Sequence, residues 1–277
     1  MKDNEFKISH SQYKMFDRCP LSFWFNQGLG LEPRDQYKSL ALRQGFELQR
    51  VLSQSGGEPA QFFEGEELVP LYIKTLINYI RKFSLLPEDV AWEVRCEKDG
   101  IVGTMDLFKD SWLGEIKFTA SPDWYYNNFI AFDQLETYFY LKDEARRGFM
   151  LPIRVPGLKR KVKEDECDEA MGERFDDDLW KRASHYFPGL DTKRPDGEPK
   201  WGRVYGHLEC DKDEVKKKVA WTIGEIRNCC KAGYWPYRRN CFVGMKNPCD
   251  YMSICTTRTI NDDIYVRKER DDLWERK

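Results

Sequence analysis

The sequence lacks the long apolar segments that membrane and secreted proteins carry. No run is long enough to span a bilayer, and the N-terminal stretch MKDNEFKISH has no signal-peptide core. Net charge is also almost absent, because 45 Lys and Arg residues balance 47 Asp and Glu residues. The chain as a whole therefore has no general attraction for nucleic acid, and we expect a soluble, cytoplasmic protein with no membrane partner.

Other absences narrow the function further. The sequence contains no G-x-x-x-x-G-K-[ST], so it predicts no phosphate-binding loop and no built-in helicase. It has only three histidines, His10, His185 and His207, which we interpret as ordinary residues. There is no internal repeat and no sharp composition break, so we expect a single domain over residues 1–277.

Apolar periodicity predicts an α/β protein. We expect helices at 11–27, 38–54, 65–84, 130–146 and 212–232. We expect strands at 91–97, 101–108, 112–119, 149–155 and 203–209. Residues 157–200 are polar and indicate an insertion with one short helix. The last helix carries an apolar stripe of Val215, Val219, Ile223, Ile226 and Cys230.

The stretch GTMDLFKDSWLGEIKF, residues 103–118, predicts a β-hairpin that turns at KDS. A two-residue loop there places Lys109 opposite Trp112 and Asp106 opposite Glu115. Like charges opposed in this way destabilise a sheet. A divalent cation such as Mg²⁺ would reverse that penalty, since it takes one or two carboxylates in protein sites.

Strand alternation puts Lys117 on the same face as the two carboxylates. The opposite face is a good core, formed by Met105, Leu107, Ile116 and Phe118. A solvent-exposed hairpin face with unrelated charges is the simplest alternative. A glycosidase also uses two carboxylates, but direct opposition leaves too little room for the water of an inverting enzyme.

These residues resemble the PD-(D/E)XK nuclease superfamily, and in particular its RecB-like exonuclease branch. The family pattern is G-x-x-D, a hairpin turn, (D/E)-x-K and a helix with Q-x-x-x-Y. The matching segments here are 103–106, 115–117 and 134–138. The resemblance implies a restriction-endonuclease-like core, with a mixed central sheet flanked by helices, N-terminal helices and a C-terminal cluster-binding segment.

The resemblance also implies roles for individual residues. They are the Mg²⁺ or Mn²⁺ ligands Asp106, Glu115 and, through its carbonyl, Ile116; the catalytic Lys117; and the supporting Gln134 and Tyr138. Because Gln134 and Tyr138 lie four apart, they share one helix face. Taken alone, that pair indicates a polar patch on a surface helix. Because it follows the hairpin along the chain, we favour the interpretation that it belongs to the nuclease motif.

One part departs from the family pattern, which has an upstream helix with G-x-x-x-H and a histidine ligand. The corresponding segment here is RQGFELQRVL, and counting from Gly45 puts Gln49 in the histidine's place. An amide is a weaker ligand than imidazole, although its oxygen suits Mg²⁺ or Mn²⁺. Either Gln49 binds the metal, or this ligand is lost and activity is reduced.

Nine cysteines in an intracellular protein suggest metal ligands or core residues more than disulfides. Cys241, Cys249 and Cys255 are clustered, and Cys19 lies near the N-terminus. Four thiolates suit zinc or a [4Fe–4S] cluster, but zinc sites usually comprise two close pairs. The arrangement resembles the iron staple of CRISPR-associated RecB-like nucleases and their phage homologues, which implies that these four cysteines bind a [4Fe–4S] cluster.

Such a cluster would join the N-terminal helix to the C-terminal segment and constrain a very long loop. Cys229 and Cys230 compete as ligands, although Cys230 lies on the apolar stripe and is expected in the core. Buried thiols without metal are the remaining alternative.

The resemblance implies a Mg²⁺- or Mn²⁺-dependent deoxyribonuclease, an exonuclease in phage or bacterial DNA recombination, repair or processing. Its partners would be DNA ends, including single strands, and a helicase, recombinase or integration protein in a bacterial or phage-infected cell. The rival interpretation is a non-catalytic DNA-binding or assembly protein that retains a structural cluster. The missing histidine favours the rival, whereas the retained Asp106, Glu115 and Lys117 argue against it.

Two segments are candidates for binding the strand. The basic run GLKRKVK at 157–163, extended by Arg154, is either a phosphate track or a solvated loop. The aromatic residues Trp124, Tyr125 and Tyr126 either stack on bases or cover the core.

Overall fold

The computed structural model describes residues 7–34, 40–53, 68–127, 130–158, 161, 166–195, 198, 200, 204–206, 210–238 and 249–268. The chain divides into two compact units. The terminal unit comprises Met1–Lys38, Glu97–Gly103 and Asp213–Lys277, and the central unit comprises Ser39–Cys96 and Thr104–Lys212. No helix in the described ranges is both long and apolar enough to cross a bilayer. The single domain expected from composition stays a prediction.

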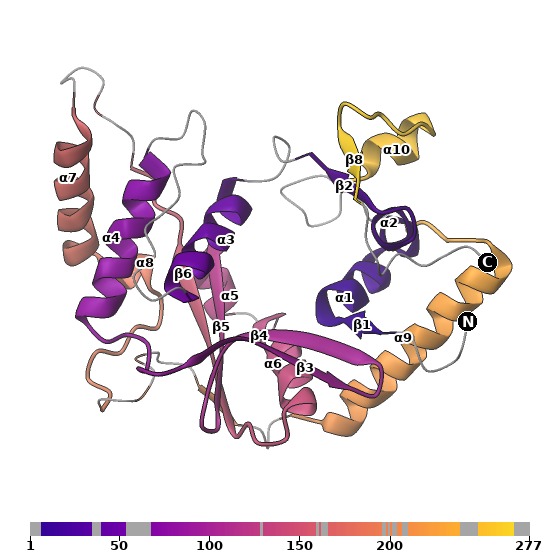
Figure 1. The fold of residues 1–277 in the computed structure, drawn as a ribbon, viewed down its shortest axis with the longest axis horizontal. Coiled ribbons are helices and arrows are strands. Elements are labelled where there is room, and N and C mark those ends of the chain that lie inside the picture. The colour runs from indigo at the N-terminus through magenta and orange to yellow at the C-terminus, as the bar shows by residue number, and fades with distance from the viewer. Residues whose placement is uncertain are drawn as a thin grey trace. The chain divides into compact units, whose positions relative to one another are not determined.

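A mixed sheet forms the framework of the central unit (Figure 1). Its strands are β3 (Ala91–Lys98), β4 (Ile101–Lys109), β5 (Trp112–Thr119), β6 (Arg147–Arg154) and β7 (Val204–Gly206). β4 and β5 are antiparallel, β5 and β6 are parallel, and β6 and β7 are antiparallel. The mixed α/β class, the hairpin and its neighbouring strands are therefore confirmed.

Helices pack against this sheet and against one another. They are α3 (Leu40–Ser53), α4 (Leu68–Lys82), α5 (Pro122–Asn127), α6 (Ile130–Leu141), α7 (Asp168–Lys181) and α8 (Ala183–Tyr186). α3 packs on β5 and α6 on β6, while α4 and α7 lie side by side (Figure 1). Pro70 falls in the first turn of α4, where its missing N–H has no intrahelical partner to lose.

The polar segment 157–200 contributes far more than the one short helix that was predicted. α7 is 14 residues long, and its Met171, Phe175 and Leu179 are fully buried. These side chains join the core that also includes α4 and Leu107 of β4. Because the three residues lie four apart, they form one apolar stripe, which the surrounding charges obscured in the sequence.

The terminal unit begins with β1 (Ile8–Ser9), which pairs in parallel with Ile101 and Val102 of β4. The predicted helix at 11–27 is broken into α1 (His10–Arg18), α2 (Pro20–Phe23) and a π-helical turn, η1 (Trp24–Gly28). The break is at Cys19, which is extended with φ −161° and ψ 107°. Proline disfavours the helical conformation in the residue before it, so Pro20 explains the break.

The remaining elements of the terminal unit are β2 (Leu31–Pro33), α9 (Lys212–Ala232), α10 (Met252–Thr257) and β8 (Tyr265–Arg267). β2 and β8 pair antiparallel. α9 agrees with its predicted bounds and buries the first four residues of its apolar stripe. The fifth, Cys230, is exposed, so the prediction that it lies in the core is wrong.

Candidate metal and catalytic site

The β4–β5 hairpin sets the positions of the two acidic residues. Lys109 pairs with Trp112, as predicted, and the ladder ends one residue pair before Asp106 and Glu115. Both carboxylates therefore lie where the two strands stop pairing with each other. Asp106 is 8% exposed and Glu115 is 3% exposed. This burial rules out the alternative of a solvent-exposed hairpin face.

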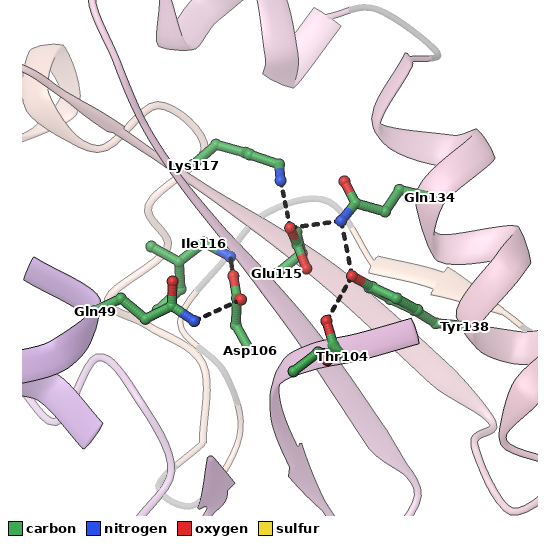
Figure 2. Close-up of polar contacts among 8 residues, drawn as sticks. All are labelled: Gln49, Thr104, Asp106, Glu115, Ile116, Lys117, Gln134 and Tyr138. Carbon is green, nitrogen blue, oxygen red and sulfur yellow. Dashed lines mark hydrogen bonds and ion pairs between the residues drawn. The ribbon is translucent and has the colours of Figure 1, made fainter. Parts of the chain in front are cut away.

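Asp106 is held by one backbone donor and one side-chain donor (Figure 2). The N–H of Ile116 donates to its Oδ2 at 2.7 Å, and Nε2 of Gln49 donates to its Oδ1 at 2.8 Å. Two donors on two different oxygens fix the plane of the carboxylate. The contacts of Ile116 and Gln49 are made by their N–H groups, so both orient Asp106; metal binding through their oxygens stays a prediction.

Glu115 is satisfied on only one of its two oxygens. Its Oε1 accepts hydrogen bonds from Nζ of Lys117 and, at 2.7 Å, from Nε2 of Gln134. Its Oε2 is buried and has no hydrogen-bond partner among the described residues. Leaving a buried polar atom unsatisfied costs on the order of 1–3 kcal/mol, and more for a charged group. Oε2 therefore has the surroundings of an atom that binds a cation.

Helix α6 supports Glu115 from the other side of the site (Figure 2). Nε2 of Gln134 also donates to the hydroxyl of Tyr138 at 2.8 Å, and that hydroxyl donates to the carbonyl of Thr104 at 2.8 Å. Tyr138 is 4% exposed, so the alternative of a surface polar patch is wrong. Thr104 anchors α6 to β4 through its backbone carbonyl.

The charges of the site influence one another. Burial, together with the negative charge of Glu115, raises the pKa of Asp106 to about 7, although the donors on Asp106 oppose the rise. Burial lowers the pKa of Lys117, but the charge and hydrogen bond of Glu115 and the charge of Asp106 outweigh it, so the pKa is raised. Lys117 is therefore an ammonium at neutral pH, and a proton would compete with any cation for Asp106.

Gln49 reaches Asp106 because α3 lies close to β5. A Cβ at Gly45 would lie 3.4 Å from Cβ of Phe118, which is an ordinary van der Waals contact, so α3 packs closely on β5 at this point. Gln49 is one turn further along the same face of the helix. Glu47 points elsewhere and pairs with Arg50 at 2.7 Å. The structure therefore places Gln49 beside Asp106.

Three of the four predicted cluster cysteines lie in the described part of the terminal unit, and Cys241 lies outside it. Cys19 and Cys249 are buried, and Cys255 is partly buried. Cys249 packs in a small apolar cluster with Leu31, Tyr251, Ile254 and Tyr265. Low-polarity surroundings suit thiolates of a cluster. Within the described ranges, no three Cys, His, Asp or Glu residues form a metal-binding group, so the cluster stays a prediction.

Arg154 does not extend a basic track. It donates to the carbonyls of Ala120 at 3.0 Å and His185 at 2.8 Å, and it pairs with Asp123. All three guanidinium nitrogens are thus used to brace α5 against its neighbours. Most of the basic run at 157–163, and His207, lie outside the described residues.

No family model matches the chain, and no curated protein matches it. The function must therefore be argued from the site itself. Its strongest feature is a buried pair of carboxylates with one unsatisfied oxygen.

Proposed function

We propose that the protein is a Mg²⁺- or Mn²⁺-dependent nuclease that hydrolyses phosphodiester bonds of DNA, acting from strand ends. The observation that carries this proposal is the buried, unpartnered Oε2 of Glu115 beside Asp106 and Lys117. A hard divalent cation prefers carboxylate oxygens. The donor set of this site is made of oxygens, so it fits Mg²⁺ or Mn²⁺ better than a thiophilic metal.

The residues around the carboxylates have separable tasks in this proposal. Ile116 and Gln49 hold Asp106, while Gln134 and Lys117 hold Oε1 of Glu115 so that Oε2 stays available. Lys117 carries a positive charge and is partly exposed, with 28% of its side chain accessible. Its ammonium group is therefore placed to attract a phosphate and to stabilise charge that develops on it. A bound divalent cation would activate water and neutralise phosphate charge.

The order of elements supports the same assignment. A hairpin that carries Asp106 and Glu115 is followed by α6, with Gln134 and Tyr138, and then by β6 parallel to β5. This is the order that the resemblance to the PD-(D/E)XK superfamily implies. We propose on the same resemblance that the four cysteines bind a [4Fe–4S] cluster, and that a helicase, recombinase or integration protein is the partner.

The test is a cleavage assay on end-labelled single- and double-stranded DNA with Mg²⁺, Mn²⁺ or EDTA. We expect metal-dependent cleavage by the wild type, and a loss of about 10²–10⁴-fold in Lys117→Ala, because charge stabilisation in the transition state is removed. Lys109→Ala, on the same hairpin beside the turn, is the matched control and should cleave normally.

A non-catalytic DNA-binding or assembly role is the second candidate. The observation that favours it is Gln49, an amide where the nuclease family carries a histidine ligand. Metal-dependent cleavage no greater in the wild type than in Lys117→Ala would support this second role.

A further inference from the structure

Helix α5 is fixed directly beside the candidate site. It begins at Pro122, shortly after β5 ends at Thr119, and it packs against both β5 and β6. Arg154, the last residue of β6, pairs with Asp123 of α5 and donates to the carbonyl of Ala120. The helix is therefore clamped onto the end of the strand that carries Glu115 and Lys117.

The three aromatic residues of α5 occupy different environments. Tyr126 is partly buried and lies against Gly189, where an added Cβ would be 2.2 Å from its ring. Tyr126 thus covers the protein interior. Trp124 is 44% exposed, and its ring contacts Tyr125 edge-on, with centroids 5.2 Å apart at 87°. An exposed indole supported by a second ring is a different feature from a core aromatic.

Tyr125 links this ring to the site. Tyr125 lies on α5, which follows Lys117 closely along the chain and packs against β5, the strand that carries this lysine. The side chain of Lys117 is itself partly exposed. A phosphate that contacts Lys117 would therefore bring its adjoining nucleotide towards Tyr125 and Trp124.

We propose that Trp124, backed by Tyr125, is a stacking platform for an unpaired base, so that the site takes single-stranded nucleic acid in preference to a closed duplex. This deepens the proposed nuclease function and rests on it. Aromatic stacking is tolerant of sequence because every base offers a π-face. In a closed duplex those faces are already stacked on neighbouring bases, so an exposed indole gains little from it.

The experiment measures binding by fluorescence anisotropy of a labelled single strand and of a labelled blunt hairpin duplex. Ca²⁺, which also binds carboxylate oxygens, replaces Mg²⁺, and cleavage is followed separately with Mg²⁺. We expect Trp124→Ala to bind the single strand at least about fivefold more weakly, because one stacked base is lost. Duplex binding should change less than twofold, and Trp124→Phe should retain most of the wild-type affinity.

The matched control is Trp180→Ala, which removes a tryptophan with the same 44% exposure from α7, where it packs on Tyr79 and Phe83. This variant should bind like the wild type. The platform proposal is wrong if Trp124→Ala binds the single strand as tightly as the wild type does. It is also wrong if the variant loses equal affinity for the single strand and the duplex. If the wild type binds strands through Trp124 but never cleaves them, the nuclease proposal fails and the platform stands. If the wild type cleaves strands and neither binding nor cleavage depends on Trp124, the platform proposal fails and the nuclease proposal stands.

Discussion

The two sites that the sequence assigned to metals behave differently in the structure. In the central unit, each carboxylate lies in its own hydrogen-bonded group (Figure 2): Gln49 and the N–H of Ile116 hold Asp106, and Lys117, Gln134 and Tyr138 lie around Glu115. In the terminal unit, Cys19, Cys249 and Cys255 lie on short elements or between them. The fourth cysteine of the set lies outside the described residues.

The difference follows from what fixes each side chain. The carboxylates sit on paired strands, and their partners come from α3 and α6, so backbone pairing and helix packing set the geometry without a ligand. The cysteines lie near chain ends and loops, where a metal itself would supply much of the order. The side chains of the proposed cation site are therefore in place without an ion, whereas the proposed cluster site is expected to depend on its cluster for folding.

The largest effect that we predict concerns the cysteines, and it tests whether the terminal unit depends on a cluster for folding. We expect Cys249→Ser or Cys255→Ser to abolish iron binding and visible colour and to destabilise the terminal unit by several kcal/mol, because cluster affinity contributes to folding. Iron and zinc analysis with thermal unfolding checks this. Removal of divalent cations with EDTA should, by contrast, stop cleavage and leave the fold intact.

Cys167→Ser is the matched control for the cluster, because Cys167 is exposed at the start of α7. It should keep the wild-type metal content and stability. A colourless protein with stoichiometric zinc would show that the cysteines bind zinc and not an iron–sulfur cluster. A protein that contains neither metal would show that the cysteines are thiols without a metal.

A smaller effect concerns the pH dependence of the carboxylate site. The pKa of Asp106 is raised to about 7, against an ordinary value of about 3.9. Between these values the native protein keeps a proton that the unfolded chain has lost, so this residue's contribution to stability is present at low pH and falls as pH rises towards about 7. We expect Asp106→Asn to remove this fall, of about 1–4 kcal/mol.

The measurement is chemical denaturation of both proteins across this pH range in EDTA. Mg²⁺ should stabilise the wild type more at about pH 8 than at about pH 5, because the ion and the proton compete for Asp106. Parallel pH curves for the wild type and Asp106→Asn would contradict a proton held at this residue.

The hairpin was predictable because strand alternation and turn residues are local signals. Asp106, Glu115 and Lys117 could therefore be placed on one structure from sequence. The hydrogen bond from Gln49 to Asp106 was not predictable, since it depends on how closely α3 approaches β5. The unsatisfied Oε2 of Glu115 likewise depends on which donors β5 and α6 bring to this carboxylate.

The fold was harder to predict where charges outnumber apolar residues. The stripe Met171, Phe175 and Leu179 has helical spacing and could have identified α7, but the polar composition of 157–200 dominated the interpretation. At Cys19, Pro20 was a sufficient signal for a break. The apolar residues that follow Pro20 suggested a continuous helix, but the proline disfavours the helical conformation at Cys19 and the helix breaks there.

A still smaller effect tests the role of Gln49. Gln49→His should raise the preference for Mn²⁺ over Mg²⁺ by about tenfold, because imidazole nitrogen favours transition metals over Mg²⁺. Gln49→Leu removes the hydrogen bond to Asp106 and supplies no nitrogen ligand, so it should weaken binding of both ions similarly, by about 1 kcal/mol. Calorimetric titration of each ion checks this, and an unchanged Mn²⁺ to Mg²⁺ ratio in Gln49→His would place Gln49 away from the ion.

The most direct test is calorimetric titration of Mn²⁺ and Mg²⁺ into the wild type and Glu115→Gln, with Glu144→Gln, on an exposed side chain, as control. We predict that the wild type and the control bind the ions equally, and that Glu115→Gln binds them at least about tenfold more weakly because a carboxylate ligand is lost. Equal binding by all three proteins, or none by the wild type, would contradict a cation site at Asp106 and Glu115.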